Sequence, residues 1–255
     1  MDKNISAVPK PRAEVIRPEI TRLPKLTFFR RVYRFFILGL IRMAVRSLAR
    51  CEVKGLKNIP RQDPALMVSN HLGDADLIVG LAYSPVPLEF ISKAELHDFP
   101  ILGKLMDAYG AIWVHRGQPD RRAIRIALEC LRQGRIVAIT PEARESVTGA
   151  LEEGTGGAAY LALKADVPLV PITFTGTENN RIYRNLKRLR RTDITLTIGQ
   201  PFRLEQLPDR REAIDKGTQK IMEMLASQLP LDYRGVYSRQ GESRPGTMQS
   251  RAAEE

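Results

Sequence analysis

The sequence predicts an α/β fold, in which a largely parallel central sheet is flanked by helices and preceded by an amphipathic N-terminal helix. From residue 65 onward, short apolar runs alternate with segments of helical periodicity, as is typical of βαβ units. The expected strands are 65–69, 89–92, 111–114, 135–140, 169–175 and 194–198, and the expected helices are 75–83, 98–108, 119–133, 156–165 and 205–229. In such sheets, ligands bind where strands end and helices begin.

Length and composition are those of an ordinary globular protein. The 255 residues suffice for one domain with extensions, and 43% hydrophobic with 27% charged residues exclude disorder throughout the chain. Two cysteines, Cys51 and Cys130, are too few for a disulfide framework and favour a reducing compartment. We expect no secretory signal, because residues 1–19 are polar and lack an apolar stretch. We expect no transmembrane helix either, because arginines interrupt the most apolar segment, 32–48.

The net charge of +11 is concentrated near the N-terminus. Residues 1–50 contain 12 of the 40 basic and 3 of the 29 acidic side chains. Residues 1–24, with four prolines and no apolar periodicity, are expected to form a disordered basic arm. Residues 25–50 are expected to form an amphipathic basic helix with Arg42, Arg46 and Arg50 on one face. This helix either docks on the domain or lies on an anionic membrane surface.

These boundaries leave an α/β domain at residues 51–230. The polar segment that follows, residues 231–255, is expected to be a disordered tail.

One histidine has a context that suits catalysis. His71 lies in SNHLGDAD (69–76), after a predicted buried strand, and Asp76 follows five residues later in the first turn of a predicted helix. If the ring folds over the helix start, the Asp76 carboxylate accepts Nδ1–H and leaves Nε2 free as a base. The alternative is structural: Asp74 and Asp76 favour the helix N-terminus, and His71 is a turn residue.

Other chemistries lack their motifs. One histidine with two aspartates offers no zinc-ligand pair, and no G-x-S-x-G segment occurs in the chain. His97 is interpreted as a surface residue, and so is His115, although its place at a strand end would also suit a site. Without a protein nucleophile, His71 would activate a substrate hydroxyl or water directly.

Basic residues follow three of the expected strands. Lys93, Arg116 and Arg144 each lie at the predicted carboxyl end of a strand, on the same sheet edge as His71. Arginine offers bidentate donors to a phosphate and lysine a point charge. Each alone is an ordinary surface cation, but their convergence predicts an anion-binding site.

Two further segments are given structural interpretations. GTGGAA (154–159) matches a dinucleotide-binding pattern but follows no buried strand, so it is interpreted as a loop leading into a helix. The basic cluster at 181–191 is interpreted as a solvated face, with lipid headgroups or nucleic acid as alternative partners.

Taken in order, these segments resemble the bacterial 1-acylglycerol-3-phosphate acyltransferases and the wider glycerolipid acyltransferase family. The resemblance covers about residues 50–202 and includes a His-x-x-x-x-Asp motif and three further blocks. The matching segments are Asn70-His71 through Asp76, Lys93 with Gly110-Ala-Ile-Trp-Val-His-Arg116, Thr140-Pro-Glu-Ala-Arg-Glu-Ser146, and Val167-Pro-Leu-Val-Pro-Ile172.

The resemblance implies a role for each matched residue. His71 would be the general base toward the glycerol hydroxyl, oriented by Asp76. Basic residues would hold the acceptor's phosphate, namely Arg116, Arg144 and Lys93. Glu142 would help to shape the acceptor site. The family's chemistry implies no cofactor and no covalent enzyme intermediate, because the thiol of an acyl thioester leaves without strong acid assistance.

The third block departs from the family pattern. Glu145 occupies the family's arginine position, and Arg144 lies one residue before it. A small shift of the loop would let Arg144 serve in its place. Otherwise the acceptor's headgroup differs from that of lysophosphatidate.

The sequence thus predicts an acyltransferase that moves a fatty acyl chain from acyl-CoA or acyl-carrier protein to 1-acyl-sn-glycerol 3-phosphate, giving phosphatidate. It would be a peripheral protein of the anionic cytoplasmic face of the cell membrane. The alternatives are a different lysolipid or glycolipid acceptor, and a non-catalytic protein that binds membrane or nucleic acid. A nucleic-acid partner is not expected, because the body of the chain is nearly neutral and its basic cluster lacks interleaved aromatics.

Overall fold

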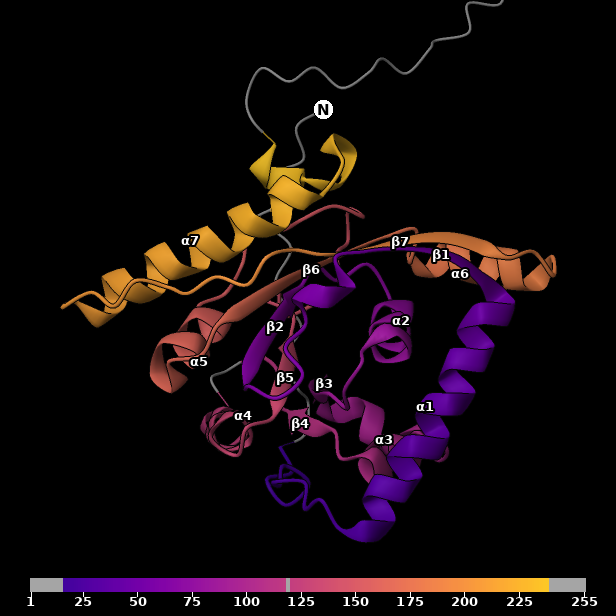
Figure 1. The fold of residues 1–255 in the computed structure, drawn as a ribbon, viewed down its shortest axis with the longest axis horizontal. Coiled ribbons are helices and arrows are strands. Elements are labelled where there is room, and N and C mark those ends of the chain that lie inside the picture. The colour runs from indigo at the N-terminus through magenta and orange to yellow at the C-terminus, as the bar shows by residue number, and fades with distance from the viewer. Residues whose placement is uncertain (1–15, 118–119, 239–255) are drawn as a thin grey trace, which may run out of the picture.

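Seven strands form one mixed sheet in the order β1–β7–β6–β2–β5–β3–β4 (Figure 1). The computed structural model describes residues 16–117 and 120–238. The strands are β1 (Ala49–Lys54), β2 (Ala65–Ser69), β3 (Glu89–Lys93), β4 (Ile112–Val114), β5 (Ile136–Ile139), β6 (Leu169–Thr175) and β7 (Thr192–Ile198). All neighbouring strands pair in parallel except β6 and β7. The predicted α/β fold class is confirmed.

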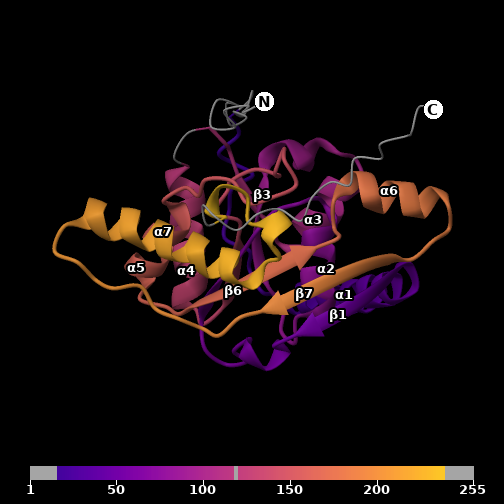
Figure 2. The same ribbon diagram turned by 90° about the horizontal axis from the view of Figure 1, so that it is seen from above.

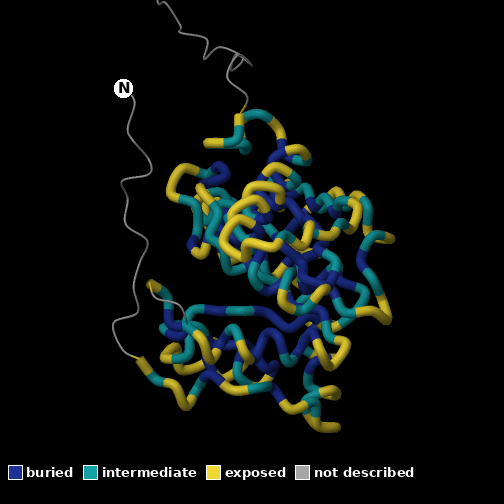
Figure 3. The backbone as a smooth tube through the Cα atoms, turned by 90° about the vertical axis from the view of Figure 1, so that its left-hand side faces the viewer, coloured by how far each residue is buried: buried dark blue, intermediate teal, exposed yellow. Residues whose placement is uncertain are grey.

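Helices cover both faces of the sheet (Figures 1 and 2). They are α1 (Phe28–Leu48), α2 (Ala75–Tyr83), α3 (Leu102–Tyr109), α4 (Arg121–Arg132), α5 (Gly157–Ala165), α6 (Asn179–Lys187) and α7 (Arg210–Gln228). One buried cluster joins α1, α2 and α3 to the sheet, and a second joins α4, α5 and α7. Within β2, Met67 belongs to the first cluster while Leu66 and Val68 belong to the second, because successive side chains of a strand point to opposite faces. The sheet is therefore the middle of three layers, and its buried strands contrast with exposed helix turns in Figure 3.

Two elements were missing from the sequence-based prediction. The strand β1 occupies Ala49–Lys54, where we expected the helix to run to residue 50. It is an edge strand whose alternate residues are exposed, so it has no continuous apolar run, and no glycine or proline separates it from α1. The helix α6 contains no buried residue, and its short apolar face, formed by Ile182, Tyr183 and Leu186, gives only a weak signal in the sequence.

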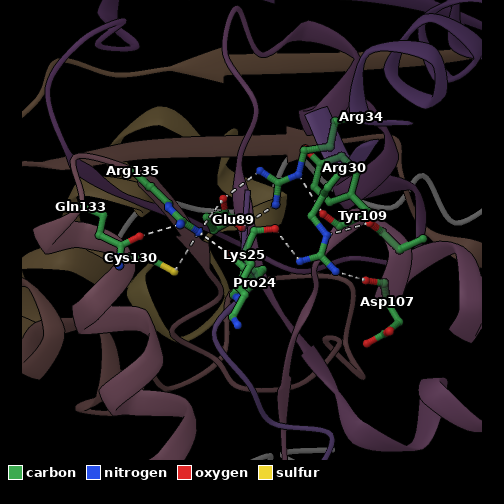
Figure 4. A network of polar contacts seen from close by, with 11 residues as sticks. Pro24, Lys25, Arg30, Arg34, Glu89, Asp107, Tyr109, Cys130, Gln133 and Arg135 are labelled. Carbon is green, nitrogen blue, oxygen red and sulfur yellow. Dashed lines mark hydrogen bonds and ion pairs between the residues drawn. The ribbon is translucent and has the colours of Figure 1, made fainter. Parts of the chain in front are cut away.

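The orientation of α1 differs from the expected one. Arg34 is buried in a bidentate ion pair with Glu89 at 2.8 Å (Figure 4). Arg42 donates to the carbonyl oxygens of Ala82 and Ser84. Arg50 lies in β1 and not in the helix. The exposed outer face of α1 is instead apolar, and its large side chains are Phe28, Phe29, Val32, Phe35, Phe36, Leu40 and Met43. Inward arginines are possible here because a carboxylate and backbone carbonyls satisfy their guanidinium groups.

The described part of the expected disordered arm is ordered. The Thr21 hydroxyl donates to the Trp113 carbonyl oxygen, and the Arg135 guanidinium donates to the carbonyl oxygen of Pro24. At the other end, residues 231–237 form two 3-10 turns, and Leu151 N–H donates to the carbonyl oxygen of Tyr233. Both predictions of disorder are therefore wrong for these residues. The order here comes from long-range hydrogen bonds, which leave no periodic pattern in the local sequence. Residues 1–15 and 239–255 lie outside the described residues.

Within residues 16–117 and 120–238, no helix has the length and apolar character needed to cross a membrane.

Candidate active site

Four loops meet along one edge of the sheet. They follow the adjacent parallel strands β2, β5, β3 and β4, and they contain His71, the 140–146 segment, Lys93 and Arg116 respectively. With about 4.8 Å between neighbouring strands, the backbones at the two ends of this row are about 14 Å apart. Long basic side chains span most of that distance. The expected sheet edge therefore exists, with the histidine at one end and Arg116 at the other.

Asp76 organises the turn that contains His71. One carboxylate oxygen, Oδ2, lies 2.9 Å from His71 Nδ1 and accepts the backbone N–H groups of Leu72 and Gly73 at 2.7 and 3.0 Å. A Cβ on Gly73 would lie 2.6 Å from the side-chain oxygen of Asn179, so only glycine allows this close approach. The turn itself is anchored by Asn70, whose buried amide bonds both backbone groups of Phe174 on β6.

This arrangement fixes the tautomer of His71. A ring nitrogen beside a carboxylate carries the proton, so Nδ1–H donates to Asp76 and Nε2 has its lone pair available. The His71 side chain is 29% exposed and that of Asp76 is 5% exposed, so the base faces outward from a buried orienting carboxylate. The structural alternative, in which both aspartates serve only the helix terminus, leaves this contact unexplained.

The pKa of His71 is raised above its ordinary value. Burial alone lowers it, but the hydrogen bond and charge of Asp76, with the nearby Glu145 and Glu142 carboxylates, outweigh burial. Because only neutral imidazole accepts a proton, a reaction that uses this base declines as pH falls through the raised pKa.

Asp76→Asn tests this electrostatic coupling. The amide cannot stabilise imidazolium, so we expect the acid limb of the kcat/KM profile to move to lower pH. The rate at the optimum should fall by about 10²–10⁴-fold, because the tautomer is no longer fixed. The check is a pH–rate profile of thiol release for both proteins, and an unchanged acid limb would contradict the coupling.

Glu142 holds the active-site loops together from within. Its two carboxylate oxygens accept the backbone N–H groups of His71 at 3.0 Å and Glu152 at 2.8 Å. It is 1% exposed, and burial raises its pKa to about 7 even though both hydrogen bonds oppose that shift. The side chain thus positions the turn of the histidine, whereas sequence reasoning expected it to help shape the acceptor site.

Arg144 lies in an unexpected position. Its Nε donates to Glu152 at 2.6 Å, and both side chains are less than 10% exposed. Moving this guanidinium to a ligand would leave the Glu152 carboxylate buried without its charge partner, which is costly. The geometry therefore argues against Arg144 as a phosphate ligand.

Glu145 faces the site instead. Its Oε1 accepts a hydrogen bond from Asn179 at 2.8 Å, and its charge acts on His71 and is influenced by Lys93. Burial raises the pKa of Glu145, and the neighbouring Asp74 and Asp76 add to that effect. A carboxylate therefore occupies the place where the family resemblance implied an arginine.

Lys93 and Arg116 remain available for an anion. Both are partly exposed, and neither forms an ion pair with any described residue. The Nε of Arg116 is buried without a hydrogen-bond partner among the described residues. A buried donor without a partner is unusual and is expected where a ligand completes the bonding.

Sequence reasoning missed that the chain has a second His-x-x-x-x-Asp motif. His115 Nδ1 lies 3.0 Å from Asp120, in the same geometry as the first dyad. Its Nε2, however, accepts the backbone N–H of Arg17 at 2.8 Å, and the residue is 3% exposed. Asp120 meanwhile accepts two N–H groups at the start of α4. This dyad is structural, because the nitrogen that would act as a base is already occupied.

The other motifs behave as expected. GTGGAA (154–159) leads into α5, with no strand before it, and so does not form a dinucleotide-binding turn. Most of the basic cluster at 181–191 is exposed on α6 and the loop after it.

Comparison with known proteins agrees with these features. The acyltransferase family model matches residues 50–175. A chloroplastic 1-acyl-sn-glycerol-3-phosphate acyltransferase of Brassica napus is 31% identical over 58% of this chain and 44% of its own length. A lyso-ornithine lipid O-acyltransferase of Pseudomonas aeruginosa is 34% identical over 49% of this chain and 47% of its own length. The matched region thus spans about half the length of these curated relatives.

A solved structure has the same fold. The crystal structure of a 1-acyl-sn-glycerophosphate acyltransferase from Thermotoga maritima aligns with a TM-score of 0.60, at 21% identity, over 80% of this chain and 84% of that chain. The matched residues, 50–175, include the His71–Asp76 dyad and the loops of the site, with the partly exposed base at the carboxyl end of β2. The chain therefore belongs to the glycerolipid acyltransferase family, which includes the 1-acylglycerol-3-phosphate acyltransferases.

Proposed function

We propose that this protein transfers a fatty acyl chain from an acyl thioester, acyl-CoA or acyl-carrier protein, to the free hydroxyl of 1-acyl-sn-glycerol 3-phosphate, giving phosphatidate. The observation that supports this most directly is the His71–Asp76 dyad, with a partly exposed base and a buried orienting carboxylate. The names of the relatives favour the same reaction.

The dyad can perform the transfer with one proton shuttle. His71 Nε2 takes the proton of the acceptor hydroxyl as the oxygen attacks the thioester carbonyl carbon, and Asp76 stabilises the imidazolium that forms. The tetrahedral intermediate collapses with cleavage of the C–S bond. The leaving thiolate takes the proton back from His71, so the products are the ester and the free thiol.

Lys93 and Arg116 are the proposed ligands of the acceptor's phosphate. They follow β3 and β4, on the side of the site away from β6, and Arg116 Nε has no hydrogen-bond partner among the described residues. Arg144 is not part of this proposal, because it pairs with Glu152.

The outer face of α1 is the proposed contact with the membrane. It is lined by large exposed apolar side chains, among them Phe29 at 82% and Phe36 at 63% exposure. Such a face is unfavourable in water and suits the headgroup–acyl boundary, where Arg31 on the same helix can reach anionic headgroups. A peripheral position would bring the site to its lipid acceptor.

Thiol release from an acyl-CoA, with liposomes and added lysophosphatidate, tests the proposal. Release should depend on lysophosphatidate, and Arg116→Ala should raise the acceptor's KM by roughly 10- to 100-fold while changing the donor's KM little. If only the donor's KM rises, Arg116 belongs to the donor subsite. If acyl-CoA gives no release with any acceptor, the same assay with acyl-carrier protein decides whether the protein is an acyltransferase.

A second acceptor class is favoured by Glu145. A half-buried carboxylate beside the base, together with Arg144 held by Glu152, suits an acceptor whose headgroup has a cationic amine. The similarity to a lyso-ornithine lipid O-acyltransferase supports this candidate. The same assay separates the two: release that requires an amine-bearing lysolipid, and responds to Glu145→Gln in the acceptor's KM, favours the second.

A further inference from the structure

An open pocket of about 780 Å³ lies beside α1, apart from the active site. It is lined by the last turn of α1, the start of β1, the end of β6 and the beginnings of α6 and β7, and none of the site residues discussed above belongs to it. Four arginines from these elements converge on it: Arg46, Arg50, Arg181 and Arg191. We call it the four-arginine pocket.

Little negative charge balances these guanidinium groups. Among the residues that the structure describes, Arg46, Arg181 and Arg191 form no ion pair, and Arg50 reaches Asp193 only at 3.5 Å between two exposed side chains. The other acid in the lining, Glu52, lies 3.0 Å from Lys54. Since like charges held together repel one another, this arrangement is most stable when an anion occupies the pocket.

Arg46, Arg50 and Arg191 are exposed, and one of them, Arg191, is held in place by backbone carbonyl oxygens. Arg191 Nε donates to the Ala49 carbonyl oxygen at 3.1 Å and Nη2 to that of Arg46 at 2.6 Å, which anchors it at the C-terminus of α1. Gly176 also lines the pocket, and a Cβ on it would lie 2.3 Å from the Asp193 carbonyl oxygen, so only glycine allows the chain after β6 to approach β7 this closely.

The pocket continues the apolar outer face of α1. Arg46 follows Met43 by three residues, so the two lie on the same side of the helix one turn apart, and Met43 is 61% exposed. A lipid with its acyl chains along Phe36, Leu40 and Met43 would bring its headgroup to this end of the helix. A soluble phosphate compound would make no use of that apolar continuation.

We infer that the four-arginine pocket binds the phosphate of an anionic phospholipid headgroup, at a site separate from the acyl acceptor. Paired guanidinium groups supply bidentate donors to phosphate oxygens, and Tyr83, which also lines the pocket, offers a hydroxyl. This inference rests on the pocket and α1, and it does not depend on the proposed reaction.

Vesicle binding tests it with a matched pair of variants. Arg46→Gln/Arg181→Gln removes two charges from the pocket, and Arg211→Gln/Lys220→Gln removes two exposed charges from α7, which lies far from α1 in Figures 1 and 2. Sedimentation with phosphatidylcholine vesicles, with and without phosphatidate, gives the partition coefficients. We expect the pocket variant to lose roughly 30-fold in affinity for phosphatidate vesicles, about fivefold for each guanidinium, and the control less than about twofold.

Further measurements identify the ligand. Binding to pure phosphatidylcholine should be unchanged in both variants, and Arg46→Lys/Arg181→Lys should recover part of the loss, because charge is kept without bidentate geometry. Equal losses in pocket and control variants would show diffuse charge and overturn the site. If inorganic phosphate or glycerol 3-phosphate displaces the protein from vesicles as effectively as phosphatidate does, the ligand is a soluble phosphate compound and the inference is wrong. If the pocket variant selectively loses binding to duplex DNA, the ligand is nucleic acid and the inference is wrong as well.

Failure here is distinguishable from failure of the proposed reaction. With detergent-dispersed substrates the pocket variant should release thiol as the wild type does, because no pocket residue lies among the groups proposed for catalysis. Absence of thiol release in the wild type would count against the reaction alone.

Discussion

Replacing His71 by alanine is expected to abolish acyl transfer while leaving the fold intact. The side chain is 29% exposed, and among the described residues its ring bonds only Asp76, so the turn keeps the Asp76 bonds to the backbone of Leu72 and Gly73. Removing the general base costs about 10²–10⁴-fold in kcat, and loss of the base's position against the acceptor hydroxyl adds to this. The measurement is lysophosphatidate-dependent thiol release, with circular dichroism to follow the fold.

The second His-x-x-x-x-Asp motif provides the matched control. His115→Ala deletes a buried ring whose two nitrogens contact Asp120 and the backbone N–H of Arg17. We expect a loss of about 1–3 kcal/mol in unfolding free energy, with kcat per folded molecule nearly unchanged. Transfer by His71→Ala within a few-fold of wild type, or a catalytic loss confined to His115→Ala, would reverse the assignment of the two dyads.

Replacing Arg34 by methionine is expected to be the most destabilising single change outside the apolar core. Arg34 fastens α1 to the sheet through two 2.8 Å bonds to Glu89 and one to the carbonyl oxygen of Tyr109 (Figure 4). Both charged side chains are less than 5% exposed, and Arg135 at 3.5 Å is the other cation near Glu89. Removing one partner of a buried pair costs about 3–5 kcal/mol, or roughly 6–20 °C in Tm for a domain of this size.

A second variant distinguishes the loss of the ion pair from the cost of leaving one buried charge unpaired. In Arg34→Met/Glu89→Leu neither charge remains unpaired, so we expect recovery of at least half the loss in Tm, while Arg135 keeps its bonds to Pro24 and Gln133. Lys216→Gln, which removes an exposed i,i+4 pair with Glu212, should leave Tm unchanged. A small loss from Arg34→Met would show that α1 is held mainly by its apolar contacts.

Much of the fold was predictable because its signals are local. The buried strands 65–69 and 169–175 coincide with β2 and β6, and the helix at 75–83 coincides with α2. Continuous apolar runs bounded by turn residues reveal such elements without reference to the rest of the chain. β1 and α6 were missed since neither has a continuous buried face; their positions depend on pairing with β7 and on packing at the end of the sheet.

The catalytic pair was predictable for the same reason. His71 and Asp76 are five residues apart, so the turn between them decides their contact, and Gly73 makes that turn possible. Alternation of strands and helices placed Lys93 and Arg116 at the same sheet edge before any distance was known.

The sequence by itself determined the α/β architecture, the dyad and the sheet edge on which the site lies, because each has a local signal: apolar runs that alternate with helical segments, and two residues five positions apart. Only the tertiary structure decided which of two identical motifs is free to act, that Arg144 belongs to Glu152, and that α1 turns Arg34 and Arg42 inward. The first and the third depend on partners far apart in the chain, whereas Arg144 and Glu152 are only eight residues apart and are brought together by the folding of their loop. Since the free energy of a buried charge is set by what surrounds it, residue type and spacing alone do not reveal its role.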